Sequence, residues 1–328
     1  MNGVISVAFV YLGGELPKYA RLNLSALVKR FPHLEFILIS DNLQNDKLSG
    51  IDFFYFDSSS TLNDLTSKSS LDREFRQGFW IHTMSRFAAL LAFMAENPQL
   101  PIIHFELDVW IAENFPFSVF ESLDFEIAFS LPAVSEGSAA VLYLRDYDAA
   151  LKLSGIIRNT IYKTPTSTDM TILRKIYDEN LMSTKILPIS PEEDTFDTDP
   201  FVGYLFDPST WGMYFLGQDP RNSRGLQVFH REEKHHKVKP SKYDLVSDGR
   251  TIRVLKGSVE FSLVNLHVHS KDLRIFGDIN RSTKNIKKYL NKKSKGEFVE
   301  FKVRVFGQQL GKKFLKVIRH LVRNFRNE

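Results

Sequence analysis

Cysteine is absent from the 328-residue sequence. Its absence excludes a disulfide framework, a cysteine nucleophile and any zinc or iron–sulfur site built on thiolates. Carboxylates and histidines are therefore the remaining candidates for metal ligands. Hydrophobic residues make up 43% of the chain and charged residues 25%, which is the balance of a globular protein rather than of a disordered or coiled-coil chain.

Long apolar runs are also missing. A helix that crosses a bilayer needs about 20 apolar residues, and even the run at 87–94 is far shorter. The first six residues, MNGVIS, lack the basic start and the apolar stretch of a secretory signal. We therefore expect a cytoplasmic protein that does not span a membrane.

Three common enzyme motifs do not occur. The sequence contains no G-x-G-x-x-G, no Walker P-loop and no G-x-S-x-G elbow. Their absence argues against dinucleotide-dependent dehydrogenases, P-loop NTPases and α/β-hydrolases.

Charge is distributed unevenly along the chain. Residues 281–328 contain 15 Lys and Arg against three Glu, whereas the first 280 residues carry a net charge of −8. An acidic body argues against nucleic acid as a partner. The basic C-terminal segment instead favours contact with an anionic surface.

Short apolar runs alternate with helical periodicity over the first part of the chain. β-rich runs occupy 4–11, 35–40, 52–56, 101–105, 125–131 and 139–144, and helical patterns occupy 16–30, 75–96, 147–159 and 169–180. This alternation predicts an α/β fold with a mostly parallel sheet flanked by helices. Residues 190–250 are irregular, and so long an irregular segment is expected to be functional. After it we expect a strand at 258–269, a Lys-rich helix near 282–291, a strand at 297–306 and a final helix from 308.

Two acids follow the apolar run at 101–105. Glu106 and Asp108 are two residues apart and therefore lie on one face of an extended chain. Open α/β sheets bind ligands at this end of their strands, and two carboxylates there could hold Mg²⁺ or Mn²⁺ together with a substrate diphosphate. The alternative is a solvated strand end, because acid pairs with this spacing are common.

The segment LVNLHVHSK at 263–271 alternates between apolar and polar residues. Its polar face carries Asn265, His267, His269 and Lys271. One imidazole could complete an octahedral site with the two acids, and Lys271 could neutralise a phosphate. The alternative is an edge strand whose polar face meets water.

Two other segments hold candidate side chains. The stretch FDPSTWGMYFLGQDPRN at 206–222 combines aromatic rings with hydrogen-bonding groups, which predicts a sugar site, although an Asx turn at Asp219 explains part of the pattern. His235 and His236 lie in the charge-dense stretch 231–239, which favours a solvated loop over a metal site. Asp169 follows Ser-Thr and, from the residues alone, is an N-cap or first-turn acid of a helix.

Taken together, these segments resemble bacterial polysaccharide glycosyltransferases of the GT-A fold. The resemblance covers about residues 4–276 and is carried by the opening strand, FWIHTMSRF at 79–87, FELDVW at 105–110, the stretch 206–222 and NLHVHSK at 265–271. It implies a nucleotide-sugar transferase domain at 1–276 and a basic helical extension at 277–328. Such enzymes bind a divalent metal and a diphosphate through Asp-x-Asp. Glu106-Leu107-Asp108 occupies that place, with Glu as its first acid.

The resemblance also implies roles for the neighbours of this motif. Val10, Tyr11 and Gly13 at the end of the first strand, and Asp41 after the second, would border the nucleotide base and ribose. Arg86 would lie near the diphosphate.

Further roles implied by the resemblance concern the metal and the sugar. A histidine near the end of the domain would complete the metal site, and either His267 or His269 matches by position, with His267 preferred. Asp169 would lie beside the donor sugar or act in catalysis.

The implied reaction moves a sugar from a nucleotide sugar, expected to be UDP-linked, to a glycan or a lipid-linked acceptor in cell-surface polysaccharide synthesis. Inversion at the anomeric carbon would need a carboxylate base, for which Asp169 and Asp219 are available, whereas retention lets the diphosphate take the proton. We favour retention. The alternatives are a non-catalytic module that binds carbohydrate or membrane, and a glycoside hydrolase. A hydrolase is disfavoured because adjacent same-face acids are better placed to share a cation than to flank a sugar.

The C-terminal segment generates a prediction of its own. Apolar residues recur at three- and four-residue spacing over 308–326, interleaved with Lys and Arg, which is the pattern of a basic amphipathic helix. Each Lys or Arg near an anionic leaflet contributes about 1 kcal/mol. We expect the whole chain to sediment with anionic but not neutral vesicles at low salt, and a chain ending at Phe306 to stay in solution. The hypothesis under test is that the protein is peripheral on the cytosolic face of the inner membrane. If neither chain sediments with anionic vesicles, the alternative is favoured, in which this helix packs on its own domain.

Overall fold

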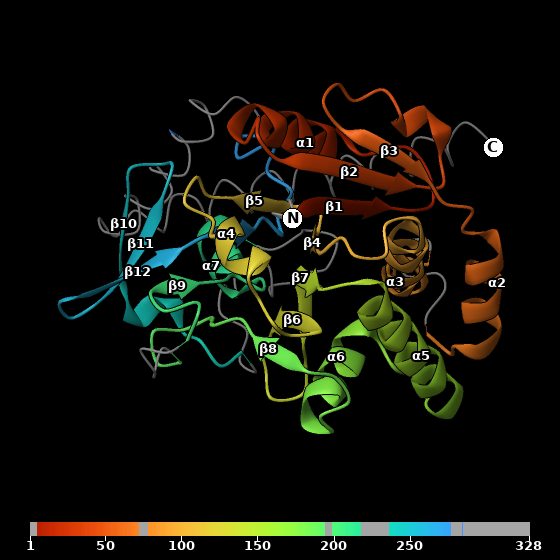
Figure 1. Cartoon of the computed structure of the whole chain (residues 1–328). Coiled ribbons are helices and arrows are strands. Elements are labelled where there is room, and N and C mark those ends of the chain that lie inside the picture. Colours follow the sequence, from red (N-terminus) through yellow and green to blue (C-terminus); the bar gives the residue numbers. More distant parts are fainter. Residues whose placement is uncertain (1–4, 72–77, 194–198, 218–235, 277–283, 285–328) are drawn as a thin grey trace, which may run out of the picture.

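The main sheet has the strand order β3-β2-β1-β4-β7-β6-β8 (Figure 1). Its strands are β1 (Ser6–Tyr11), β2 (Glu35–Ser40), β3 (Asp52–Tyr55), β4 (Ile102–Phe105), β6 (Ile127–Ser130), β7 (Ser138–Leu144) and β8 (Thr184–Ile186). Strand β7 runs antiparallel to β4 and β6, and the other neighbouring strands pair in parallel. The computed structural model describes residues 5–71, 78–193, 199–217, 236–276 and 284.

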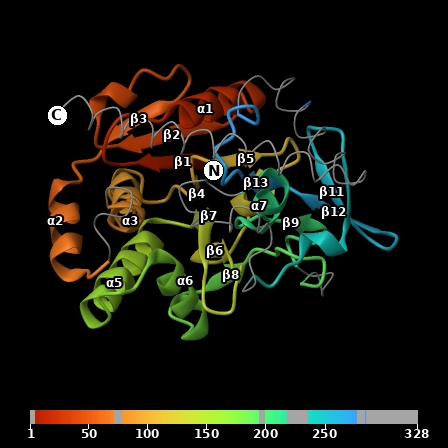
Figure 2. The same cartoon turned by 180° about the vertical axis from the view of Figure 1, so that it is seen from behind.

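Helices cover both faces of this sheet (Figures 1 and 2). Val7 and Phe9 of β1 face a core shared with α1, whereas Ala8 between them faces a core shared with α3, α5 and α6. Strands covered on both sides are apolar at nearly every position, which explains the long apolar runs in the sequence. The predicted mostly parallel α/β sheet flanked by helices is confirmed. The helices are α1 (Lys18–Arg30), α2 (Ser59–Lys68), α3 (Phe79–Glu96), α4 (Phe117–Glu121), α5 (Tyr147–Lys163), α6 (Asp169–Asp178), α7 (Thr210–Leu216), and the 3₁₀ turns η1 (Leu43–Asn45) and η4 (Pro240–Lys242).

Two smaller sheets lie beside the main one and share a third core. One has the order β10-β11-β12-β9, and the other pairs β13 antiparallel with β5. Their strands are β5 (Val109–Ile111), β9 (Tyr204–Leu205), β10 (Asp244–Ser247), β11 (Ile252–Lys256), β12 (Val259–Leu263) and β13 (Asn265–His267). The expectation of one strand over 258–269 was wrong. The chain changes sheets at Val264, whose N–H donates to the Leu205 carbonyl, because β13 pairs with β5 instead of continuing β12.

The carboxyl ends of β1, β2 and β4 meet at one edge of the main sheet because these strands are parallel. Gly13, Asp41 and Glu106 follow them in turn. The strand order reverses between β1 and β4, and this is where open α/β sheets bind their ligands. The fold therefore brings three of the predicted site residues to the edge where a ligand is expected.

The predicted extension at 277–328, with its helices near 282–291 and from 308 and its strand at 297–306, lies outside the described residues apart from Lys284. Within the described part of the chain, no helix has both the length and the apolar character required to cross a membrane.

Phenylalanine rings form much of the core beneath the predicted ligand edge. Phe120 is fully buried and contacts Phe115, Phe201 and Phe206, with ring centres 4.8–5.9 Å apart. Phe120→Ala should therefore lower the free energy of unfolding by about 3–5 kcal/mol, because the cavity it leaves is closed on all sides. Tyr162→Ala is the matched control, since that ring is 75% exposed. Denaturant titration of both variants checks this, and equal losses would contradict the proposed core.

Candidate active site at the end of strand β4

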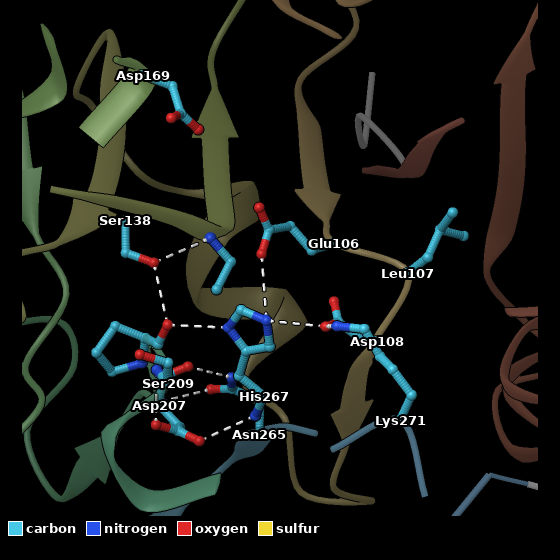
Figure 3. Close-up of polar contacts among 12 residues, drawn as sticks. Glu106, Leu107, Asp108, Ser138, Asp169, Asp207, Ser209, Asn265, His267 and Lys271 are labelled. Atoms are coloured by element: carbon cyan, nitrogen blue, oxygen red, sulfur yellow. Dashed lines mark hydrogen bonds and ion pairs between the residues drawn. The ribbon is translucent and has the colours of Figure 1, made fainter. Parts of the chain in front are cut away.

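Glu106, Asp108 and His267 converge beyond the end of β4. The two acids lie in the turn between β4 and β5, and β13 places His267 opposite Val109 of β5. Nε2 of His267 lies 3.1 Å from Oδ2 of Asp108 and 3.4 Å from Oε2 of Glu106 (Figure 3). One potential ligand atom from each residue lies within 4.8 Å of the others. The acids were predicted on one face of an extended chain, but they lie in a turn, in which the Val109 N–H donates to the Glu106 carbonyl at 3.0 Å. The turn still brings both carboxylates to one centre with His267, the preferred histidine.

The imidazole of His267 is held in one orientation. Its Nδ1–H donates to the Pro208 carbonyl at 2.9 Å, and Ser138 Oγ donates to the same carbonyl at 3.2 Å. In the neutral ring, Nε2 then carries a lone pair that faces the two carboxylates. Metal-binding histidines are commonly oriented in this way by a backbone carbonyl. Two carboxylates and an imidazole form a donor set that suits Mn²⁺ or Mg²⁺ with open positions, so the residues present fit a divalent cation.

A buried carboxylate that the sequence did not single out supports His267. Oδ2 of Asp207 accepts hydrogen bonds from the backbone N–H of His267 at 2.9 Å and of Gly212 at 2.7 Å, while Oδ1 accepts from Trp211 and Ser209 at 2.9 Å each. Burial raises the pKa of Asp207, against the opposing effect of these donors. The side chain therefore ties the start of α7 to β13.

Asn265 fixes the turn that contains Asp207. Its Oδ1 accepts from the Asp207 N–H at 3.0 Å, and its Nδ2 donates to the Asp207 carbonyl at 2.9 Å. The side chain was predicted to form part of a polar strand face. The structure places it in the interior, where it supports the histidine beside it. The only signal in the sequence was the Asp-Pro-Ser turn pattern at 207–209, typical of an Asx turn.

Arg86 lies behind the acids. Its guanidinium forms ion pairs with Glu106 and with Asp169, and its side chain is 8% exposed. Burial raises the pKa of Glu106, but the charge and hydrogen bond of Arg86, together with the nearby His267 and His104, outweigh burial and bring the pKa to about 2, so Glu106 is ionised at neutral pH. Burial lowers the pKa of Arg86, and the two carboxylates more than reverse that effect. The arginine expected near a diphosphate is thus also a fixed partner of two acids.

Asp169 is the first residue of α6, and Thr168 caps that helix with a reciprocal capping box. The interpretation as a first-turn acid therefore agrees with the structure. Asp169 is nevertheless buried and paired with Arg86, which places its carboxylate near Glu106. Figure 3 shows it beyond Glu106 on the side away from His267. Asp219, the second predicted base, lies outside the described residues.

The residues predicted to border a nucleotide lie together at the ends of β1 and β2. The Gly13 N–H donates to both carboxylate oxygens of Asp41 at 3.0 Å, and Ser58 Oγ donates to Asp41 at 2.6 Å. Gly13 has a φ of 89°, and a Cβ there would meet the ring of His82 at 2.7 Å. Burial lowers the pKa of His82 more than nearby Asp41 raises it. His82 lies in the FWIHTMSRF segment but was not predicted as a site residue. Val10 and Tyr11 close β1 next to Gly13.

Two expectations were wrong. The Trp and Tyr rings of the 206–222 stretch were expected to stack on sugar, but α7 buries them: Trp211 is fully buried and its Nε1–H donates to the Ile189 carbonyl. His236 was expected in a solvated loop, but it is buried and its Nδ1 lies 2.9 Å from Thr210 Oγ1. The reason is a backbone bridge from His236 to Ala133, which ties this segment to the loop after β6.

No protein-family model matches the sequence, and no sequence match among curated proteins was found. Solved structures similar to this chain include the galactosyltransferase LgtC in complex with donor and acceptor sugar analogs. It is 14% identical, with a TM-score of 0.38 over 60% of this chain and 79% of that one. A glycosyltransferase involved in the glycosylation of the major capsid of PBCV-1 is 13% identical, with a TM-score of 0.35 over 62% of this chain and 86% of that one.

The CTP:phosphocholine cytidylyltransferase LicC from Streptococcus pneumoniae is also similar, at 11% identity and a TM-score of 0.30 over 56% of this chain and 90% of that one.

Gly212 offers a test of how His267 is held. A Cβ on Gly212 would lie 2.0 Å from the His267 carbonyl oxygen, so Gly212→Ala must displace β13 or α7. We expect a loss of about 1–3 kcal/mol in the free energy of unfolding. Gly155→Ala in α5 is the control: nothing lies within 4 Å of its Cβ, and alanine should stabilise that helix by about 0.5–1 kcal/mol. Denaturant titration, with the ring ¹⁵N shifts of His267 as a local readout, measures both. An unshifted His267 in a stable Gly212→Ala protein would refute the tight contact.

Proposed function

We propose that this protein is a metal-dependent glycosyltransferase that moves a sugar from a nucleotide sugar to a glycan or lipid-linked acceptor. The observation that carries the proposal is the convergence of Glu106, Asp108 and His267, with Nε2 of the imidazole turned toward the two carboxylates. A donor set of this kind, at the point where the strand order reverses, suits a cation shared with a diphosphate.

The residues around this centre have distinct tasks in the proposed reaction. Glu106, Asp108 and His267 would hold Mn²⁺ or Mg²⁺, which when bound supplies Lewis-acid stabilisation of a leaving diphosphate. Arg86 keeps Glu106 ionised and in place. Gly13 and Asp41 would border the nucleoside, because they lie together at neighbouring strand ends.

The position of Asp169 bears on the stereochemistry. A general base needs a carboxylate that reaches the acceptor hydroxyl, and the Asp169 carboxylate is buried against Arg86. We propose retention, in which an oxygen of the leaving diphosphate takes the proton of the acceptor hydroxyl. The donor is proposed to be a UDP-linked sugar, and the pathway to be cell-surface polysaccharide synthesis. The basic segment 277–328 is proposed to be a separate extension that contacts an anionic membrane surface.

The acids provide the direct test. Asp108→Ala should lower Mn²⁺ affinity and sugar transfer by more than about 100-fold, because even partners of metal ligands cost 10–100-fold when removed. Glu106→Ala should be milder in transfer. Asp178→Ala, which removes an exposed carboxylate on α6, is the charge-matched control. Release of UDP from UDP-sugars with and without Mn²⁺ is the assay, and full turnover of the Asp108 variant would refute the assignment.

Histidine variants sharpen the same test. His267→Ala should lose metal affinity, whereas His236→Ala should lose stability alone, since His236 is buried against Thr210 and lies outside the cluster. The opposite result in a Mn²⁺ titration would place the third ligand elsewhere. Metal binding by the wild-type protein without any UDP release from a panel of nucleotide sugars would favour a carbohydrate-binding module.

A further inference from the structure

A positively charged side chain already contacts one of the acids in the cluster. Lys271 Nζ and His267 Nε2 both contact the same oxygen, Oδ2 of Asp108. The side chain of Lys271 is 21% exposed and that of Asp108 is 8% exposed, so the pair is largely shielded from water. Figure 3 shows the lysine reaching this carboxylate from the opposite side to Glu106. The ammonium group of Lys271 therefore neutralises Oδ2 of Asp108, an oxygen that a bound metal would need as a ligand.

The backbone holds Lys271 in this position. The residue lies four positions after His267, and its N–H donates to the Val268 carbonyl at 2.8 Å. Its φ is 53°, a left-handed conformation that is uncommon for a long side chain and persists only where the surroundings impose it. Ile275 and Phe276, both buried, anchor the chain just beyond. The turn is thus built to present the lysine to the cluster.

Lys271 also has a second favourable neighbour. Its Nζ lies 5.5 Å from the centre of the Tyr19 ring on α1. A cation near an aromatic face is attracted by the ring electrons. The ammonium thus has a favourable contact with α1 in addition to its contact with the Asp108 carboxylate.

The charges around the site are incompletely balanced. Three carboxylates, of Glu106, Asp108 and Asp169, meet the cations of Arg86 and Lys271. Arg86 is shared between Glu106 and Asp169, whereas Asp108 pairs with Lys271 beside His267. A divalent cation that enters this site while Lys271 is in place meets a like charge at its own ligand, which opposes binding.

We propose that Lys271 couples the metal to the diphosphate: it holds Asp108 in the free protein and transfers to the diphosphate oxygens when the donor binds. This inference rests on the proposed function and concerns the order and coupling of its ligands. The diphosphate offers the ammonium a stronger charge-assisted partner, and the released Asp108 is then available to the metal. Each ligand thereby lowers the cost of binding the other, and the effect is reciprocal.

The test compares Mn²⁺ affinity in the full chain with and without Lys271. Lys271→Met removes the competing charge, so it should bind Mn²⁺ alone about tenfold or more tighter than wild type, within the 5–150-fold range typical of coupling between sites. Inorganic pyrophosphate should raise the Mn²⁺ affinity of wild type by a larger factor than that of Lys271→Met, after correction for the complex that the two form in solution. Isothermal titration gives both values without any sugar transfer.

Control variants separate this effect from net charge and from misfolding. Lys68→Met removes one positive charge from α2, where Lys68 pairs with Asp64, and should leave Mn²⁺ affinity within twofold of wild type. Lys271→Gln serves where the methionine variant is unstable, and Lys271→Arg, which keeps the charge, should bind Mn²⁺ as weakly as wild type.

Two failures are distinguishable. Equal or weaker Mn²⁺ binding by Lys271→Met and Lys271→Gln, alongside clear binding by wild type, would overturn the coupling and leave the metal site intact. Absence of Mn²⁺ binding in every protein, including wild type, would overturn the coupling together with the proposed function.

Discussion

The guanidinium of Arg86 links two helices to the end of a central strand of the main sheet. It projects from α3 and pairs with Glu106 at the end of β4 and with Asp169 at the start of α6. Loss of one partner from a buried ion pair typically costs about 3–5 kcal/mol, since it leaves a charge without compensation. The position of Glu106 is therefore fixed by helix packing before any ligand arrives. Preorganisation of this kind spares the protein the cost of ordering the acid during binding.

Much of the architecture was predictable because it depends on local pattern. Apolar runs with helices between them predict parallel strands, and parallel strands predict that Gly13, Asp41 and Glu106 share an edge. The two-residue spacing of Glu106 and Asp108 predicted a shared face of an extended chain, whereas the structure brings the two acids together through a turn. The alternating pattern places His267 and His269 on the same face of a strand, so the pattern alone does not distinguish which of them is the metal ligand. The structure places His267 in the cluster because β13 ends there.

Other features depend on contacts that no local pattern encodes. Asp207 supports His267 across 60 residues of sequence, and Asn265 fixes the Asp207 turn across 58. Trp211 belongs to a glycine-containing aromatic segment that suggests an open sugar site, yet its indole N–H finds a partner in the Ile189 carbonyl and the ring is buried. His236 is flanked by charges and still packs inward, owing to its bridge to Ala133. Burial in these cases is decided by the tertiary partner, not by the neighbours in sequence.

The pairing of β13 with β5 has a consequence for the biogenesis of the protein. His267 meets Asp108 across a separation of 159 residues, so the cluster is made almost entirely of distant contacts. Contacts between residues this far apart in the sequence form slowly during folding, because the entropy cost of closing the long loop between them precedes the stabilising contact. The strand that supplies the histidine, β13, also follows every strand of the main sheet in the sequence. Completion of the cluster therefore depends on the last described strand of the chain.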